Sequence, residues 1–482
     1  MSTLHFALLA AATNPHEWRR RFPFIASTRE VAGAGVAEPP LQLQLFDDAV
    51  VNALGARCLD GSPAGYYYRE GAERSSFVFF LEGGGLCVEP IDCLRRAKTD
   101  LGSSANWSQT WTDNSNVLSA NATWNLLFAN WTHVFVPYCS GDVYVGTQME
   151  KNDMGLYFAG HNTLVAVVAA LAARPSSALV GASRVLLSGG SAGGIGVFQN
   201  ADWLGGAIRA LSPSTSLAYR AAPQAGAYFV NADVVEFAQL ISLPVLDPIG
   251  KSRSVRRASL ARTLTLYLSV YPFLVLSHTH AVSCIAALPH THTHTHALTL
   301  RARADFAAVA SAYLVDFFGG DGKGKGGSAP FMDASCVAAH ASTPHQCWST
   351  AVHYPYIATP LFVAQNMFDS NQAGSIFGVD WWPLPADKAE HAAARAKYIA
   401  YFGNQTRRGI GDAVNATAKD ALWMPSCWQH TGDLCMRGGP AIRGLRMGGA
   451  LQEWWLSRGS AERVWIDSCG DALQPCNAEC DC

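Results

Sequence analysis

The sequence has no excess of charge of either sign. Its 35 Lys and Arg residues nearly balance its 37 Asp and Glu residues. Proteins that bind nucleic acid carry clustered basic residues, so we expect no nucleic-acid partner. The sequence also lacks a run of about twenty apolar residues, which a membrane-spanning helix requires. The nearest stretch, residues 264–276, is shorter and contains Pro272, so we expect no membrane span.

Paired cysteine clusters of the kind that hold zinc are missing as well. The 13 cysteines are not grouped as two paired C-x-x-C clusters, which favours disulfide bonds over a metal site. Three of the five N-x-S/T sequons lie within about 25 residues of one another, which also favours a secretory route. We therefore expect a secreted protein of the extracellular space or cell wall, with no bound metal. The candidate glycosylation sites are Asn106, Asn121, Asn130, Asn404 and Asn415.

The first residues form a poor secretion signal, because no basic residue precedes the short apolar stretch at residues 4–13. We assign residues 1–45 to an N-terminal segment with a poorly formed or truncated signal. Residues 46–482 are expected to form a single domain.

Residues 250–304 contain no acidic residue and carry His-Thr repeats at residues 290–296. A His-rich tract can bind metal. However, alternate histidines in a flexible segment have no fixed geometry for a metal ion. We interpret this part as a disordered, low-complexity insertion within the domain. Excluding its Cys284 leaves twelve cysteines, an even number that can pair fully.

Short apolar strands alternate with helical stretches along the rest of the chain. Such alternation predicts a mostly parallel central sheet with helices on both faces, an α/β fold. The apolar runs end in glycine or polar residues, as strands buried on both faces do. The expected strands cover residues 77–81, 133–137, 185–187 and 360–364, with a helix at residues 162–173 and a strand and turn at residues 46–60.

A Gly-Gly-Ser-Ala-Gly-Gly motif occupies residues 189–194, between an apolar run and the stretch 195–203. A strand, a tight glycine turn and a helix would hold Ser191 at a sharp bend with its hydroxyl exposed, where a nucleophilic serine belongs. Gly-Ser turns also serve purely structural ends, so the surrounding residues must decide between the two interpretations.

A nucleophilic serine needs a base, and the base needs an acid that holds its tautomer. In α/β-hydrolases the order along the chain is nucleophile, acid, base. Asp369 fits the acid because it follows the strand that ends near Ala364, and His430 fits the base further on. The competing histidines are His340, His345 and His353, which precede Asp369, and His391, which lies in an alanine-rich helical pattern.

The same chemistry needs backbone N–H groups aimed at the developing oxyanion. Residues 83–85 are three glycines that directly follow an expected strand, so Gly84 and Gly85 can approach a carbonyl oxygen closely. Ala192, the residue after the nucleophile, offers a further donor. A tight turn without catalytic purpose is the alternative for the three glycines.

Six motifs in this order resemble the pectin acetylesterase family, which also includes the carboxylesterase Notum. The resemblance extends from about Phe46 to the cysteine-rich end and excludes residues 250–304. The motifs are Cys-Leu-Asp-Gly-Ser at 58–62, Leu-Glu-Gly-Gly-Gly-Leu-Cys at 81–87, Tyr-Cys-Ser-Gly-Asp at 138–142, Leu-Ser-Gly-Gly-Ser-Ala-Gly-Gly at 187–194, Phe-Asp-Ser at 368–370 and Ser-Cys-Trp-Gln-His at 426–430.

The resemblance implies an α/β-hydrolase fold and a metal-independent serine esterase without cofactors. Matched motif by motif, it makes Ser191 the nucleophile, Asp369 the orienting acid and His430 the base. It also makes Gly84, Gly85 and Ala192 the oxyanion donors and suggests that the cysteines form disulfides. The chain departs from the usual family pattern at Leu86, Gly190 and Asn371, beside the expected catalytic atoms.

The triple-glycine loop looks more like the plant-type members of the family, which implies an acetylated polysaccharide, pectin or a related cell-wall polymer, as substrate. The alternatives are removal of a fatty acyl group from a protein, and a carbohydrate-binding relative without activity. Tryptophans at positions 107, 111, 124 and 131 could stack on sugar rings, although core packing is the more frequent use of tryptophan. We expect a monomer.

Overall fold

The computed structural model describes eleven stretches of the chain, and the insertion expected at residues 250–304 lies outside them. All structural statements below concern these stretches. They are residues 38–87, 90–112, 116–174, 178–211, 216–229, 331–376, 389–432, 434–436, 438–457, 462–468 and 474–480.

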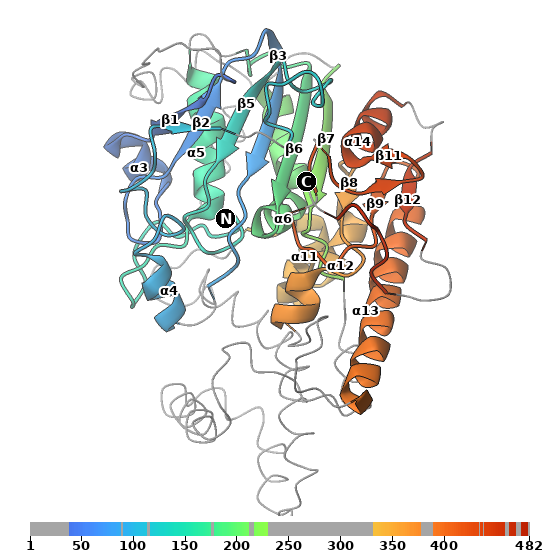
Figure 1. Ribbon diagram of the computed structural model, residues 1–482. Helices are drawn as coiled ribbons and strands as arrows, with labels where there is room; N and C mark the ends of the chain where they lie inside the picture. The colour runs from blue at the N-terminus through green and yellow to red at the C-terminus, as the bar shows by residue number, and fades with distance from the viewer. Residues whose placement is uncertain are drawn as a thin grey trace, which may run out of the picture.

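A ten-stranded sheet forms the centre of the protein, with the order β12-β9-β8-β7-β6-β3-β5-β2-β1-β4. Every neighbouring pair from β12 to β5 is parallel, and the pairs from β5 to β4 are antiparallel. Figure 1 shows this order running from β1 and β2 at one edge to β9 and β12 at the other. The sheet is therefore mostly parallel, as the alternation of strands and helices predicts.

The strands of the sheet are β1 (Leu41–Leu45), β2 (Gly65–Arg69), β3 (Glu73–Leu81), β4 (Thr110–Trp111), β5 (Trp131–Val136), β6 (Arg184–Gly190), β7 (Ala218–Gln224), β8 (Phe362–Ala364), β9 (Ala421–Met424) and β12 (Val464–Ile466), and a separate hairpin pairs β10 (Ala441–Ile442) with β11 (Leu445–Arg446). The α-helices are α3 (Asp48–Leu54), α4 (Pro90–Arg96), α5 (Gly160–Ala173), α6 (Ala192–Leu211), α11 (Ala334–Ala339), α12 (Thr350–His353), α13 (Ala389–Asn415) and α14 (Met447–Leu456). Short 3₁₀ turns cover Pro344–Trp348 and Tyr354–Tyr356, and a π-turn covers Asn371–Ile376.

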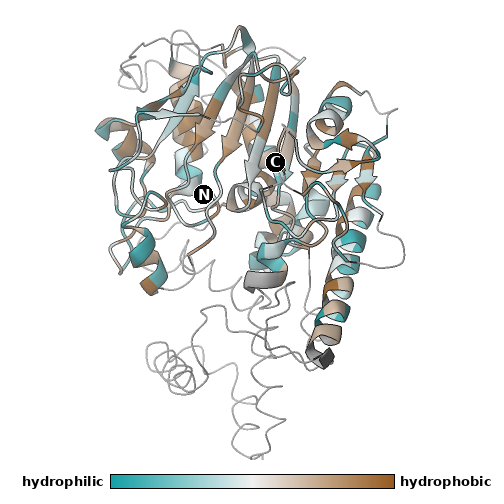
Figure 2. Cartoon of the chain, viewed as in Figure 1, coloured by the Kyte–Doolittle hydropathy of each residue, from teal (hydrophilic) through white to brown (hydrophobic). Residues whose placement is uncertain are grey.

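The two faces of the sheet bury separate apolar clusters, because successive side chains of a strand point to opposite faces. In β3, Phe77 and Phe79 join the cluster beneath α5, α6 and α13, whereas Val78 joins the cluster beneath α14. Figure 2 shows the central strands as strongly hydrophobic segments. Helices thus cover both faces, which agrees with the predicted α/β-hydrolase-like fold.

The expected helix at residues 162–173 is α5, and the four apolar runs named as strands lie in β3, β5, β6 and β8. The strand expected within residues 46–60 is wrong, because the helix α3 (Asp48–Leu54) lies there instead. Asp47 caps the helix by accepting a hydrogen bond from the Val50 amide at 2.9 Å. The sheet also begins upstream of residue 46, since β1 pairs with β2.

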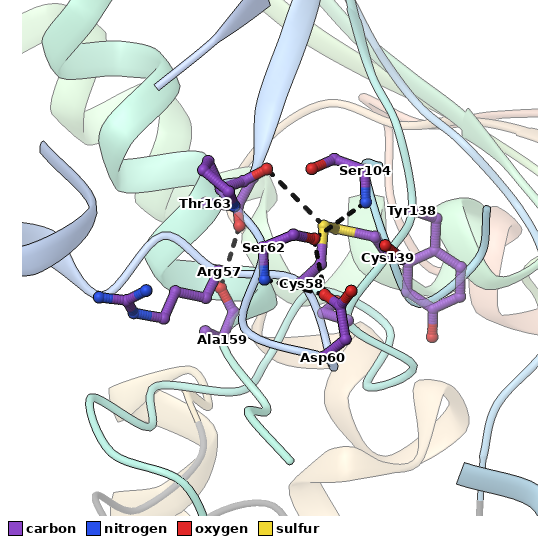
Figure 3. The surroundings of a disulfide bond; sticks show 12 residues. Arg57, Cys58, Asp60, Ser62, Ser104, Tyr138, Cys139, Ala159 and Thr163 are labelled. Carbon is purple, nitrogen blue, oxygen red and sulfur yellow. Dashed lines mark hydrogen bonds between the residues drawn. A yellow bond between two sulfur atoms is a disulfide. The ribbon is translucent and has the colours of Figure 1, made fainter. Parts of the chain in front are cut away.

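Disulfide bonds join loops near the carboxyl ends of the strands. Cys58 pairs with Cys139 across 81 residues of sequence, and Cys427 pairs with Cys480. Figure 3 shows the Cys58–Cys139 bond with Ser62 and Ser104 beside it. The Ser104 amide donates to Ser62 Oγ at 3.0 Å, which ties a further loop to this crosslink.

Two further disulfides, Cys87–Cys93 and Cys336–Cys347, join cysteines only 6 and 11 residues apart in the sequence. Cys435 and Cys476 are disulfide-bonded as well. Paired cysteines fit a protein that folds in an oxidising compartment. Among the described residues, no helix is long and apolar enough to cross a membrane.

Candidate active site

Ser191 stands at the bend between β6 and α6, as its motif predicts. Its φ angle is 57°, in the left-handed region that non-glycine residues seldom adopt. The Ser191 amide donates to the carbonyl oxygen of Gln224 at 2.9 Å, and Ile195 N donates to the Ser191 carbonyl at 3.0 Å. The strained backbone is therefore held between the end of β7 and the first turn of α6. It presents the side chain at the carboxyl ends of the strands.

The glycines around Ser191 are required by the close approach of neighbouring backbone. A Cβ atom on Gly193 would lie 2.0 Å from the carbonyl oxygen of Leu81. A Cβ atom on Gly83 would lie 2.7 Å from the Gly190 oxygen and 3.0 Å from Ser191 Cβ. Because neither position leaves room for a side chain, the loop after β3 packs directly against the turn that carries Ser191.

Asp369 lies beyond the end of β8 and is fully buried. Its Oδ1 accepts hydrogen bonds from the amides of Asn371 at 2.9 Å and Gln372 at 3.0 Å. Its Oδ2 accepts from Nε2 of Gln365 at 2.7 Å. These donors compensate the burial of the carboxylate and fix the direction in which it points.

His430 bridges Ser191 and Asp369. Its Nε2 lies 2.7 Å from Ser191 Oγ, and its Nδ1 lies 2.9 Å from Asp369 Oδ2 and 3.0 Å from Oδ1. Because the carboxylate accepts a hydrogen bond from Nδ1, the neutral imidazole carries its proton on Nδ1. Nε2 can then accept the hydrogen bond that the serine hydroxyl donates. The neighbouring Cys427 anchors this loop through its disulfide with Cys480.

The glycine loop after β3 lies beside this group. Gly84 has a φ of 146° and Gly85 a φ of 74°, angles that favour glycine. Within the described part of the chain, no carbonyl accepts a hydrogen bond from the amide of Gly84 or Gly85. Ala192 is the first residue of α6, where the amide has no partner within the helix. The predicted oxyanion donors thus lie on elements that meet at Ser191.

This arrangement has the connections that activate a serine hydroxyl. The imidazole can accept the hydroxyl proton at Nε2, while the carboxylate at Nδ1 stabilises the positive charge that results. Ser191 follows β6, Asp369 follows β8 and His430 follows β9, which are parallel strands of the sheet. All three side chains therefore lie beyond the carboxyl ends of their strands. The described residues contain no group of three or more His, Cys, Asp or Glu side chains that could hold a metal ion.

The competing histidines have other surroundings. His353 is buried, and burial lowers its pKa. His340 lies near the Tyr356 hydroxyl, at 3.5 Å. The sugar-stacking interpretation of Trp131 is wrong, because its ring is fully buried and packs edge-on against Trp455.

The motifs in the sequence did not point to Gln365, whose side chain donates a hydrogen bond to the carboxylate of Asp369. Gln365 is fully buried, and its Oε1 accepts a hydrogen bond from the Ala227 amide at 3.0 Å. That bond directs the amide NH₂ group toward Asp369. The only signal in the sequence is the position of Gln365, four residues before Asp369 at the end of a strand.

A family model described as Pectinacetylesterase matches residues 38–252 and 316–481 of the chain. The chain belongs to the pectin acetylesterase family. Residues 253–315, which include most of the expected insertion, fall outside this match. The match begins upstream of Phe46, where the motifs by themselves placed the start of the resemblance.

Named relatives fall into two groups. Pectin acetylesterase 7 of Arabidopsis thaliana is 24% identical over 448 residues, which cover 89% of this chain and 90% of that protein. Palmitoleoyl-protein carboxylesterase NOTUM of Homo sapiens is 41% identical over 166 residues, which cover 33% of this chain and 32% of that protein. The solved structure of the Wnt deacylase Notum from Drosophila aligns with a TM-score of 0.62 and 21% identity, covering 92% of this chain and all of that one.

Both groups of relatives are named as esterases. As a member of this family, the protein is a carboxylic ester hydrolase. The structural match carries the fold alone, and it agrees with the mostly parallel sheet described above. The similarity to the plant relative extends over nearly the whole chain, whereas the similarity to the human relative is stronger but confined to a third of it.

Proposed function

We propose that the protein hydrolyses O-acetyl esters of pectin or a related cell-wall polysaccharide through Ser191, His430 and Asp369. The observation that carries the proposal is the continuous hydrogen-bonded series from Ser191 Oγ through His430 to the buried Asp369, at 2.7 and 2.9 Å. The neighbouring glycine loop supplies the remaining requirement, backbone donors for an oxyanion.

The reaction has two halves. Ser191 Oγ attacks the acetyl carbonyl carbon while His430 Nε2 takes the hydroxyl proton, and the amides of Gly84, Gly85 and Ala192 stabilise the oxyanion. His430 then returns the proton to the departing sugar oxygen, which leaves an acetyl group on Ser191. A water molecule, deprotonated by His430, attacks the carbonyl carbon of this ester, and acetate leaves as His430 returns the proton to Ser191 Oγ.

The length of the similarity favours an acetylated polysaccharide over an acylated protein. The plant relative named a pectin acetylesterase matches along 89% of this chain. The second candidate is removal of a fatty acyl group from a protein, and the 41% identity to human NOTUM over 166 residues supports it. The two candidates share the triad and differ in the acid released.

A serine-directed fluorophosphonate probe tests the triad. We expect the wild-type protein to be labelled, and Ser191→Ala to lose both the label and activity, by about 10⁵-fold or more. His430→Ala should lose labelling as well, because the hydroxyl then has no base. Equal labelling of wild type and Ser191→Ala would contradict the proposal, and so would a wild-type protein that stays unlabelled and inactive beside an active control esterase.

The substrate is tested by the acid that is released. The protein is incubated with acetylated pectin, acetylated xylan and a long-chain acyl ester, and the products are separated by chromatography. Acetate from the polysaccharides at a much higher kcat/KM than the long-chain acid supports the proposal. The opposite ratio would favour the acylated-protein alternative.

We further propose that the protein is secreted and glycosylated. The sequon residues Asn106, Asn130 and Asn415 are exposed. Asn404 lies within α13, and the hydroxyl of its sequon partner Thr406 is buried without a hydrogen-bond partner among the described residues. Because the three exposed asparagines can carry glycans, treatment of the secreted protein with an N-glycosidase should lower its mass. Mass spectrometry should place glycans on the exposed asparagines, and an unchanged mass would contradict the proposal.

A further inference from the structure

A guanidinium group lies beside the glycine loop of the candidate active site. A Cβ atom on Gly85 would come 3.4 Å from Nη2 of Arg96, the last residue of α4. A Cβ atom on Gly141 would come 3.3 Å from Cδ of the same arginine. The side chain of Arg96 therefore runs past Gly141, and its charged end reaches the loop that carries the proposed oxyanion donors.

The position of Arg96 follows from the disulfide between Cys87 and Cys93. Cys87 comes two residues after Gly85, so this bond fastens α4 to the end of the glycine loop. Cys93 and Arg96 are three positions apart in α4 and share one face of the helix. Cys87 Sγ also lies 3.0 Å from the position of a Cβ atom on Gly141. The crosslink thus aims the face of α4 that carries Arg96 at the site.

Arg96 forms no ion pair with another described residue. Its Nε and Nη1 atoms are buried and have no hydrogen-bond partner in the described stretches. Glu82, the acid closest to the loop in sequence, uses its Oε2 to accept a hydrogen bond from the Tyr138 amide at 2.8 Å. A partly buried cation without a partner costs free energy, and such groups call for a ligand or a functional explanation.

We propose that Arg96 binds a carboxylate of the substrate, so that the enzyme prefers acetyl esters on an acidic, uronate-containing polysaccharide. The inference rests on the proposed function, because it adds a second contact to the same ester-hydrolysing site. In pectin the acetylated sugars are uronates, and the carboxylate lies on the same ring as the ester. The proposal places that carboxylate beside Gly85 when the ester carbonyl binds at the glycine loop.

Arginine suits this role because its guanidinium stays charged, and Nη2, the nitrogen nearest Gly85, can donate a charge-assisted hydrogen bond to a carboxylate. Neutral polymers such as acetylated xylan have a backbone sugar without this carboxylate. A side chain of a protein that carries a fatty acyl group as an ester has no such carboxylate either. The contact therefore separates the proposed substrate class from its alternatives by charge.

The test compares kcat/KM for three polymers: acetylated polygalacturonate, the same polymer after methyl esterification of its carboxyl groups, and acetylated xylan. We expect the wild-type enzyme to prefer the free acid over its methyl ester. In Arg96→Gln this preference should fall by roughly tenfold to a hundredfold, the effect of one hydrogen-bonded charge pair. Arg96→Lys keeps the charge on a group of different shape and reach, so its preference should lie between those of the wild type and Arg96→Gln.

Arg95→Gln is the matched control, since Arg95 is the adjacent exposed residue of the same helix. It should retain the wild-type preference. The comparison of the acidic polymer with its methyl ester uses the wild-type enzyme alone. The inference therefore stays testable if Arg96→Gln folds poorly. Thermal unfolding of each variant identifies that case.

A wild-type enzyme that cleaves the acidic polymer and its methyl ester equally well would overturn the role of Arg96 and leave the esterase proposal intact. An unchanged preference in folded Arg96→Gln would do the same. If the enzyme released acetate from none of the three polymers but cleaved a long-chain acyl ester, the proposed function would fail and this inference with it.

Discussion

Replacing Gln365 by Glu should make the activity of the protein depend on pH in a way that the wild type does not. Gln365 Nε2 donates to Asp369 Oδ2 at 2.7 Å, and Gln365 Oε1 accepts from Ala227 N. A glutamic acid has nearly the same shape and can keep the Ala227 contact. When protonated it also donates an O–H to Asp369, but when ionised it faces the carboxylate as a like charge.

The size of this repulsion follows from the distance. Two unit charges 2.7 Å apart repel by about 6 kcal/mol at an effective dielectric constant of about 20. This corresponds to about 4.5 pKa units, which would raise the pKa of the introduced carboxyl from about 4.3 to about 9. We therefore expect Gln365→Glu to be active at pH 6 and to lose activity as the pH rises above about 8. Gln365→Leu, which offers no donor, should lose roughly tenfold to a hundredfold in kcat across the whole range.

The assay is kcat/KM for p-nitrophenyl acetate from pH 5 to pH 9, corrected for spontaneous hydrolysis, with urea denaturation in parallel. Gln199→Glu is the control for a buried carboxyl elsewhere, because Gln199 is buried and, within the described stretches, bonds only the carbonyl oxygens of Cys347 and Trp348. It should alter stability without changing the shape of the activity profile. A wild-type profile in Gln365→Glu, or wild-type kcat in Gln365→Leu, would refute the positioning of Asp369 by Gln365.

Two further predictions concern stability. Burial raises the pKa of Glu82 from 4.5 to about 7, so the folded protein holds a proton that the unfolded chain has released, and the free energy of unfolding should fall as the pH rises between these values. Glu82→Gln should reduce the difference between urea denaturation at pH 5 and pH 7.5, and an unchanged difference would count against the assignment. Gly193→Ala, whose methyl group would meet the Leu81 carbonyl at 2.0 Å, should prevent stable folding, whereas Gly206→Ala in the same helix has open space and should raise the thermal midpoint slightly. Similar thermal midpoints for the two alanine variants would show that the turn relaxes around the added carbon.

The buried parallel strands could be predicted from the sequence because each is a short, continuous apolar run that ends in glycine or a polar residue. Helix α5 could be predicted because its alanine- and valine-rich run is too long for a strand. Helix α3 could not, since its short apolar stretch fits either period. Tertiary packing favours the helix, because Val50, Val51 and Leu54 are buried in the apolar cluster that includes residues of α5.

The candidate site could be predicted to the extent that its chemistry requires a fixed order of residue types. Ser191, Asp369 and His430 occur in the order that the fold imposes on a nucleophile, an acid and a base. Gln365 and Arg96 could not be found in this way, because glutamine and arginine have many uses on a surface. Only the contacts with Asp369 and Gly85 distinguish these two from the other glutamines and arginines.

The pairing of β7 with β8 has a consequence for how this chain can change in evolution. The two strands are direct neighbours in the sheet, with Gln224 opposite Ala364. Gln365 and Ala227, which bond to each other just beyond the strands, are 138 residues apart in the sequence. Closing a loop costs only about 0.6 kcal/mol more for each doubling of its length. The connection between these strands is therefore a place where the gene can gain or lose long segments at little thermodynamic cost, while the spacing of the residues at the sheet edge stays the same.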